Sequence, residues 1–307
     1  MTPTSWLPPS VPPVASGTNR NSRKEQSARM SKVRFFDKRV VKIFLQITSI
    51  VSSGVSLAVI FFDIPIPCKA WAALGLVILL ALIYVAVWIW SNTLNSIKIN
   101  IDGSTVLVKV GDLFQQEGFK VIAFNEYFDT VVDNRIISEK SLNGIFIQKH
   151  LSAPVGDLDV HIENYSFGVD ELIDENFART AGKKRRYQPG TICVYNDFLL
   201  TAFSKFDDQN RASLTMQELL GFMINFWDRV NSVYALKSVS TAIFGSGITR
   251  IKNHKNISDE DLLKIMLWTF RISEMRFKYP AKLTIVIRED KIDQINLLDI
   301  KSARNGV

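Results

Sequence analysis

Three loops of this chain carry residue types that can bind a phosphorylated ligand. The first is Gly111-Asp112-Leu113, and the second is Asn125-Glu126-Tyr127-Phe128-Asp129, which follows Phe124. The third, Gly245-Ser246-Gly247-Ile248-Thr249-Arg250, is rich in glycine, so its backbone N–H groups can approach a phosphate closely. It is not the dinucleotide-binding fingerprint, because Arg250 stands in place of the third glycine. Taken singly, such loops usually only turn the chain.

Each loop follows an apolar run that is typical of a strand. The runs 97–101 and 106–110 flank Asp102-Gly103, a strong signal for a β-hairpin. The other strands that we expect are 120–124, 191–195, 198–203, 238–244, 281–287 and 294–300. Ligands of α/β sheets bind at loops beyond the carboxyl ends of strands, so all three loops qualify as binding loops.

Two long helices are predicted among these strands. The first covers 215–235, and Thr215 and Glu218 form a capping box at its start. The second covers 258–279, begins at Ser258 and is followed by Pro280, which we expect to end it. The elements together predict an α/β layer fold with a mixed sheet.

Two uncharged apolar runs precede this domain, over 43–62 and 70–90. Each is long enough to cross a bilayer as a helix, which takes about 20 residues. The turn between them is too short to hold a domain. We therefore expect a disordered basic tail over 1–37, a transmembrane hairpin over 38–92 and one domain over 93–307.

The positive charge is confined to the start of the chain. Residues 1–42 hold nine basic and two acidic side chains, which equals the net charge of +7, whereas 43–307 hold 28 of each sign. The basic balance therefore belongs to the membrane-proximal tail and argues against nucleic acid as a partner. Basic residues beside a span stay in the cytoplasm. This predicts a multi-pass membrane protein with both termini cytoplasmic, whose tail can attract anionic lipid.

The positions of the cysteines and histidines predict neither a disulfide nor a structural metal site. Cys68 is expected in the outer turn and Cys193 in the cytoplasmic domain, on opposite sides of the membrane, so no disulfide is expected. The three histidines are scattered, and no Cys/His cluster has the spacing of a zinc site. We expect no metal.

The first apolar run is polar for a membrane helix. Its hydroxyls include Ser49, Ser52, Ser53 and Ser56, several at the spacing that lets helices approach closely. Two interpretations remain: these serines pack against the second run, or they form a self-association or water-lined face.

The order of the three loops on their strands resembles the macro domain, over residues 97–302. The resemblance implies a three-layer α/β/α fold in which Asp112 binds the adenine amino group and the 245–250 loop cradles a diphosphate. The loop at Phe124, Asn125 and Glu126 would line the distal ribose. The sequence departs from the family at Asn125-Glu126-Tyr127-Phe128, where an Asn-Ala-Ala-Asn stretch is usual, and in a long insertion over 129–186.

That insertion contains the basic cluster Lys183-Lys184-Arg185-Arg186. We expect the cluster to be a solvated surface, and a phosphate-binding role is the alternative.

A hairpin followed by a macro domain resembles the membrane effectors of bacterial Thoeris anti-phage defence. In that class a TIR-domain partner consumes NAD and makes an ADP-ribose-type signal during infection, the macro domain binds it, and the membrane part disrupts the inner membrane in abortive infection. The resemblance implies homo-oligomers on activation, lipid contact, and no catalytic residue. The ligand would be an ADP-ribose derivative, with amino-acid-conjugated and cyclic forms as alternatives.

Two other functions stay open. A tethered ADP-ribosyl hydrolase would need a polar residue to position a water, and Asn125, Glu126 and Asp129 are candidates. The bulky Tyr127 and Phe128 argue against it. A passive anchor for ADP-ribosylated proteins is the third hypothesis, although an anchor needs no polar membrane face.

Overall fold

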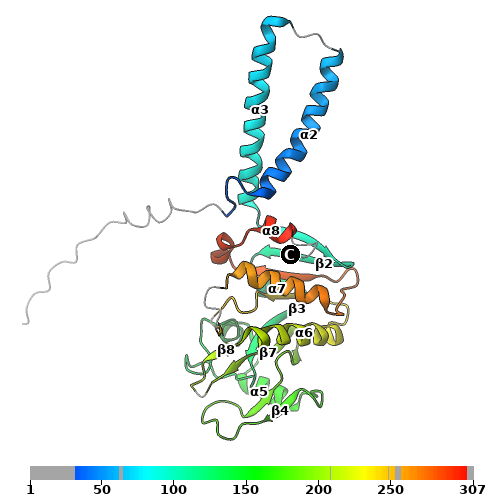
Figure 1. Cartoon of the computed structure of the whole chain (residues 1–307). Coiled ribbons are helices and arrows are strands. Elements are labelled where there is room, and N and C mark those ends of the chain that lie inside the picture. Colours follow the sequence, from blue (N-terminus) through cyan, green and yellow to red (C-terminus); the bar gives the residue numbers. More distant parts are fainter. Residues whose placement is uncertain (1–31, 62–64, 208, 248, 253–256, 303–307) are drawn as a thin grey trace, which may run out of the picture. The chain divides into compact units, whose positions relative to one another are not determined.

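The structure is a computed structural model that describes residues 32–61, 65–207, 209–247, 249–252 and 257–302 (Figure 1). Both apolar runs form long helices, α2 (Lys38–Phe61) and α3 (Ile66–Thr93). By length and composition each is a candidate membrane span, and its apolar side chains are exposed rather than buried in a protein core. The helices extend beyond the predicted runs at their described ends, and Cys68 lies in the first turn of α3 instead of in the connecting turn.

The domain that follows is built on a nine-stranded mixed sheet, as predicted. Its order is β1-β2-β11-β9-β3-β7-β8-β10, with β6 paired to β7. β2, β11, β9, β3 and β7 run parallel to one another. β1 is antiparallel to β2, β6 and β8 are antiparallel to β7, and β10 is parallel to β8. The strands are β1 (Ser96–Ile101), β2 (Ser104–Val110), β3 (Phe119–Asn125), β6 (Ile192–Tyr195), β7 (Phe198–Phe206), β8 (Ala212–Leu214), β9 (Val239–Ala242), β10 (Arg250–Ile251) and β11 (Leu283–Ile287).

The β1–β2 hairpin confirms the turn predicted at Asp102-Gly103. Both residues have positive φ, 44° and 88°, as a type I′ turn requires. The turn sets the register that pairs Ile101 with Ser104. This register buries Ile97, Ile99 and Ile101 on one face of the strand.

Helices cover both faces of the sheet, which confirms the three-layer fold. Side chains that alternate along a strand enter opposite cores, because successive residues point to opposite faces: Val121 packs in one core and Ile122 in the other. On the first face lie α6 (Met216–Val233) and α7 (Asp259–Ile272), with α8 (Leu297–Ser302) beside them (Figure 1). The second core is formed with α4 (Leu142–Ile145), the π-helix η3 (Phe146–His150) and α5 (Val155–Asn164).

The two capping boxes place the starts of α6 and α7 where the sequence predicts them. At α6, the Glu218 N–H donates to Thr215 Oγ1 at 3.2 Å, and the Thr215 N–H donates to Glu218 Oε2 at 2.7 Å. Ser258 and Asp261 form the same reciprocal pair at α7. Each box satisfies N–H groups that the first helical turn leaves without partners.

The predicted end of α7 is wrong, because the helix ends at Ile272 and not at Tyr279. Ser273 adopts an extended conformation with ψ 165°. Four residues on, the Phe277 N–H donates to Ser104 Oγ at 2.8 Å, so a contact with the sheet replaces the next helical hydrogen bonds. Pro280 therefore does not stop this helix.

The predicted strand over 294–300 is also wrong. The 3₁₀-helix η4 (Glu289–Gln294) and α8 (Leu297–Ser302) occupy this region. Asn296 Oδ1 accepts the N–H groups of Leu298 and Asp299, which is how an N-cap starts a helix. The apolar residues of the segment face the core from one helical turn instead of alternating along a strand.

Candidate functional site

The parallel strands bring the three predicted loops to one edge of the sheet. β11 pairs with β2 on one side and with β9 on the other, and β9 pairs with β3, all in parallel. The carboxyl ends of β2, β9 and β3 therefore lie on the same edge. The loop at Gly245 leaves β9 between the loops at Gly111 and Asn125, and the Gly111 N–H donates to Ile287 O at 3.0 Å.

Asp112 presents a carboxylate at this edge. It is exposed and starts the 3₁₀-helix η2 (Leu113–Gln115), where its Oδ1 accepts the Phe114 N–H at 2.9 Å. Its second oxygen makes no hydrogen bond with any residue that the structure describes, so it is free to accept one from a ligand. Leu113 is buried and anchors the turn in the second core.

An aromatic pair that the sequence did not single out lies next to Asp112. The rings of Phe114 and His150 are stacked, with centroids 3.7 Å apart and planes within 7°. Aromatic faces of this kind can hold a nucleobase by stacking. His150 comes from η3, far along the chain, so no local motif could have indicated the pair.

The glycine loop has space where a phosphate would need it. Gly245 has φ +83°, and a Cβ placed there would lie 3.4 Å from Ile251 and 3.5 Å from Leu262. At Gly247, none of the residues that the structure describes, apart from its chain neighbours, lies within 4 Å of such a Cβ. The Ser246 N–H turns back to Ile243 O at 3.3 Å, and Thr249 is partly buried.

The structure gives less about two other residues of the predicted loop, Ile248 and Arg250. Ile248 lies outside the described residues. Arg250 begins β10, where its backbone pairs with Ser213.

The loop after β3 is closed by its own contacts. Phe124 is 1% exposed and packs in the second core. Asn125 Oδ1 accepts the N–H groups of Tyr127 at 3.0 Å and Asp129 at 3.2 Å, and its Nδ2 donates to Asp129 Oδ2 at 2.8 Å. These side chains, predicted to line a ribose, are therefore committed to internal partners.

A buried ion pair fastens the insertion to this loop. Arg179 Nη2 lies 2.6 Å from Asp129 Oδ2, and the two side chains are 7% and 1% exposed. The guanidinium also lies 4.0 Å from the centre of the Tyr127 ring, and the Lys183 N–H donates to Asp129 Oδ1 at 2.7 Å. Tyr127 and Phe128 are buried with this cluster, so they pack inside the domain.

Three of the four residues of the basic cluster form ion pairs, and Lys184 lies over the Phe177 ring. Lys183 pairs with Asp159 at 2.6 Å, Arg185 with Glu175 at 3.3 Å and Arg186 with Asp174 at 2.5 Å. The last two pairs join the strands β4 (Leu172–Glu175) and β5 (Arg185–Tyr187). This arrangement favours a structural role for the cluster over phosphate binding.

Glu126 is a buried carboxyl with few partners. Burial raises its pKa, and the hydrogen bond from the Phe206 N–H at 3.1 Å and the positive charges of Arg186, Lys205 and Arg179 only partly oppose this. Ionised Glu126 is therefore less favourable in the folded chain than in the unfolded chain, so its charge lowers the free energy of unfolding.

The buried ion pair yields a first prediction. Replacing Asp129 with alanine leaves the buried Arg179 with neutral acceptors only and without its carboxylate partner, which costs about 3–5 kcal/mol of stability. Gly182→Ala should weaken the pair too, because a Cβ there would lie 2.5 Å from Asp129 Oδ1 and 2.7 Å from Arg179 Nη1. Thermal unfolding measures both. Asp290→Ala, which removes the exposed pair with Arg288, is the control and should leave the melting temperature nearly unchanged. Equal losses in Asp129→Ala and the control would show that the pair does not stabilise the domain.

A second prediction concerns pH. The raised pKa of Glu126 means that its ionisation destabilises the fold, and this penalty vanishes as pH falls below the ordinary value of 4.5, where the carboxyl is protonated in both states. Glu126→Gln keeps an acceptor for the Phe206 N–H without the charge. The variant should melt at a higher temperature than the parent chain at about pH 7, and the difference should disappear near about pH 4. A variant that is less stable at neutral pH would contradict the assignment.

Comparison with known proteins agrees with this architecture. The family model described as "Thoeris protein ThsA, Macro domain" matches residues 106–288. The Thoeris protein ThsA of Bacillus amyloliquefaciens (strain Y2) is 38% identical over 277 residues, which cover 88% of this chain and 92% of that protein.

Solved structures give weaker likenesses. A mutant of the Oceanobacillus iheyensis macrodomain with ADPR is 13% identical, with a TM-score of 0.39, and covers 68% of this chain and 96% of its own. The same macrodomain with ADP is 15% identical, with a TM-score of 0.37, and covers 68% and 94%. These likenesses are too low to carry weight. The family model and the ThsA relative show that this chain belongs to the Thoeris ThsA macro-domain family.

Proposed function

We propose that this protein is a membrane effector of Thoeris defence. Its macro-like domain would bind an ADP-ribose-derived signal that a TIR-domain partner makes during phage infection, and its hairpin would then disrupt the inner membrane. The observation that carries the proposal is the open space at Gly247, on the same sheet edge as the exposed carboxylate of Asp112. Family membership supplies the link to Thoeris defence.

The two loops fit different ends of such a ligand. Asp112 has an oxygen available to accept from an adenine amino group, and the Phe114–His150 stack beside it offers an apolar face. The backbone at Gly247 can approach a diphosphate, because no described residue other than its chain neighbours lies within 4 Å of a Cβ placed there. Titrating the domain with ADP-ribose, amino-acid conjugates and cyclic forms would identify the preferred ligand.

We further propose that the domain binds this ligand without turning it over. Asn125, Glu126 and Asp129 are the candidates for positioning a water, and all three side chains are buried. Asn125 and Asp129 belong to the buried network with Arg179, and Glu126 accepts the Phe206 N–H, so internal partners occupy most of their hydrogen-bonding capacity. Steady turnover of an ADP-ribosylated substrate by the parent chain, lost in Gly247→Val, would contradict this and favour the hydrolase.

The first helix of the hairpin supports a role beyond anchoring. Val40, Ile43 and Ile47 of α2 pack towards α3, whereas Ser49 and Ser53 are exposed. At 100° per residue, the serines fall on the side of α2 opposite the residues that face α3. The interpretation that they pack against the second helix therefore has no support. A hydroxyl-rich face is poorly matched to lipid and suits contact with a second copy or with water.

We propose a bacterial inner-membrane location with both termini in the cytoplasm. The basic side chains Lys38, Arg39 and Lys42 lie at the base of α2, and the domain leaves the base of α3 directly after Thr93. Basic residues at this end of the hairpin favour a location on the cytoplasmic side.

Ligand binding is tested by Gly247→Val. The variant should lose most of its affinity for ADP-ribose in calorimetry, because the new side chain occupies the space of the diphosphate, and it should melt like the parent chain. Gly156→Val, at a position in α5 where a Cβ also meets nothing within 4 Å, is the matched control and should bind normally. A folded Gly247→Val protein of full affinity would show that this loop is not the phosphate site.

The membrane role is tested on the serine face. Replacing Ser49, Ser52, Ser53 and Ser56 with leucine should preserve ADP-ribose affinity and abolish dye leakage in cells that also express the TIR-domain partner, because bulky side chains prevent close helix contact. The same positions changed to alanine keep the small size and should retain leakage. If the leucine variant leaks like the parent chain, α2 is only an anchor.

A further inference from the structure

The glycine loop rests directly on helix α7. A Cβ at Gly245 would lie 3.5 Å from both terminal carbons of Leu262, and the preceding Phe244 N–H donates to Met266 Sδ at 3.3 Å. Leu262 and Met266 lie one turn apart on α7 and are both buried. Because close-packed side chains transmit small shifts, a displacement of the loop must be felt by this helix.

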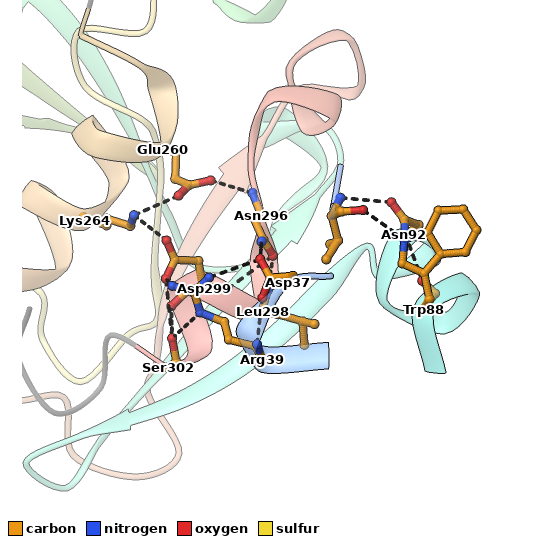
Figure 2. Close-up of polar contacts among 11 residues, drawn as sticks. Asp37, Arg39, Trp88, Asn92, Glu260, Lys264, Asn296, Leu298, Asp299 and Ser302 are labelled. Atoms are coloured by element: carbon orange, nitrogen blue, oxygen red, sulfur yellow. Dashed lines mark hydrogen bonds and ion pairs between the residues drawn. The ribbon is translucent and has the colours of Figure 1, made fainter. Parts of the chain in front are cut away.

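The same two turns of α7 hold α8 through charged groups. Lys264 Nζ lies 2.8 Å from Glu260 Oε1 on its own helix and 2.6 Å from Asp299 Oδ2 on α8 (Figure 2). Glu260 Oε2 accepts the Asn296 N–H at 2.7 Å, just before α8 begins. Two independent polar contacts therefore fix α8 to the part of α7 that carries the glycine loop.

Helix α8 in turn holds the first residues of α2. Arg39 forms an ion pair with Asp299 and donates from Nε to Ser302 Oγ at 3.0 Å (Figure 2). Asn296 Nδ2 donates to Asp37 Oδ2 at 3.4 Å. Leu298 of α8 packs with Val40 of α2 in a small apolar cluster. Asp299 thus accepts from α7 with one oxygen and from α2 with the other.

The base of α3 is tied to the same segment. The Val33 N–H donates to Asn92 Oδ1 at 3.0 Å, and Trp88 Nε1 donates to Val33 O at 3.0 Å (Figure 2). Val87 joins Val33 and Leu298 in the apolar cluster. α2 therefore contacts α8 directly, and the segment that precedes α2 connects α3 to the same place.

The three charged side chains that connect α7, α8 and α2 are partly shielded from solvent, which strengthens the attraction between them. The side chains of Asp299, Lys264 and Arg39 are 16%, 25% and 36% exposed. Burial alone would lower the pKa of the Lys264 ammonium, yet the hydrogen bonds to Asp299 and Glu260 raise it. Burial likewise opposes ionisation of Asp299, and its contacts with Lys264 outweigh this and lower its pKa. Both groups stay ionised at neutral pH.

We propose that Lys264, Asp299 and Arg39 form a relay that communicates the ligand state of the glycine loop to the membrane hairpin. The relay deepens the proposed function and rests on it. A ligand that shifts the loop shifts α7, and the charged contacts carry this through α8 to the start of α2. Its binding energy is thereby coupled to the hairpin, and the coupling works in both directions.

Hydrogen–deuterium exchange on the full chain in lipid nanodiscs tests the relay, with ADP-ribose as the probe. In the parent chain, ADP-ribose should change exchange in three segments: 257–272, 296–302 and 32–40. In Asp299→Asn, which keeps the size and removes the charge, the change over 257–272 should remain and the change over 32–40 should be lost. Calorimetry on the same samples shows whether the variant still binds and is therefore folded.

Two further variants separate a relay from a general effect of lost charge. Lys264→Arg keeps the cation and should retain the ligand-dependent change in exchange over 32–40 that the parent chain shows. Asp197→Asn removes the exposed pair with Lys237, where the side chains are 52% and 62% exposed, and should behave like the parent chain.

The outcomes distinguish the inference from the function beneath it. If the parent chain fails to bind ADP-ribose, the proposed ligand class is wrong and the relay falls with it. If the parent chain binds but 32–40 does not respond, or if Asp299→Asn still transmits the change, the relay is wrong and the proposed function stands.

Discussion

The position of β11 is the constraint on which the rest of this domain depends. This late strand, Leu283–Ile287, inserts between β2 and β9 and pairs in parallel with both, with Leu283 opposite Val106 on one side and Val239 on the other. Its side chains are almost completely buried, which fixes the register of three strands at once. The loops at Gly111 and Gly245 come to one edge because of this pairing, although more than a hundred residues separate them.

The insertion over 129–186 is attached to the loop that follows β3. Arg179 reaches back to Asp129 and Tyr127, and the β4–β5 pair carries its own charges in ion pairs. The network buries the side chains of Asn125, Asp129 and Arg179 together. Under our proposal that the domain binds a ligand without turning it over, such prior ordering lowers the entropy cost of binding.

Local signals in the sequence predict much of the fold. Asp102-Gly103 specifies a turn with two positive φ angles, and the Thr215/Glu218 and Ser258/Asp261 boxes start their helices where expected. Seven of the nine strands of the sheet follow from apolar runs bounded by turns, whereas the short strands β8 and β10 are not predicted.

What the sequence does not predict depends on contacts between distant segments. The pair of Asp129 and Arg179 joins residues 50 positions apart, and no local pattern indicates it. The stretch at 294–300 alternates well enough to suggest a strand, and only Asn296, three residues before Asp299, signals a helix start. The composition of the glycine loop identifies it in the sequence, but its packing against Leu262 and Met266 of α7 can be seen only in the structure.

The most direct test of the account is crosslinking through Cys68, which is exposed in the first turn of α3. Burial raises the pKa of the other cysteine, Cys193, to about 12, so its thiol does not compete. The full chain in liposomes is treated with a short bis-maleimide, with and without ADP-ribose. The account predicts that ADP-ribose increases the yield of crosslinked dimers in the parent chain and not in Gly247→Val. Equal crosslinking with and without ADP-ribose, in a parent chain that binds it, would contradict the claim that the ligand gathers the hairpins.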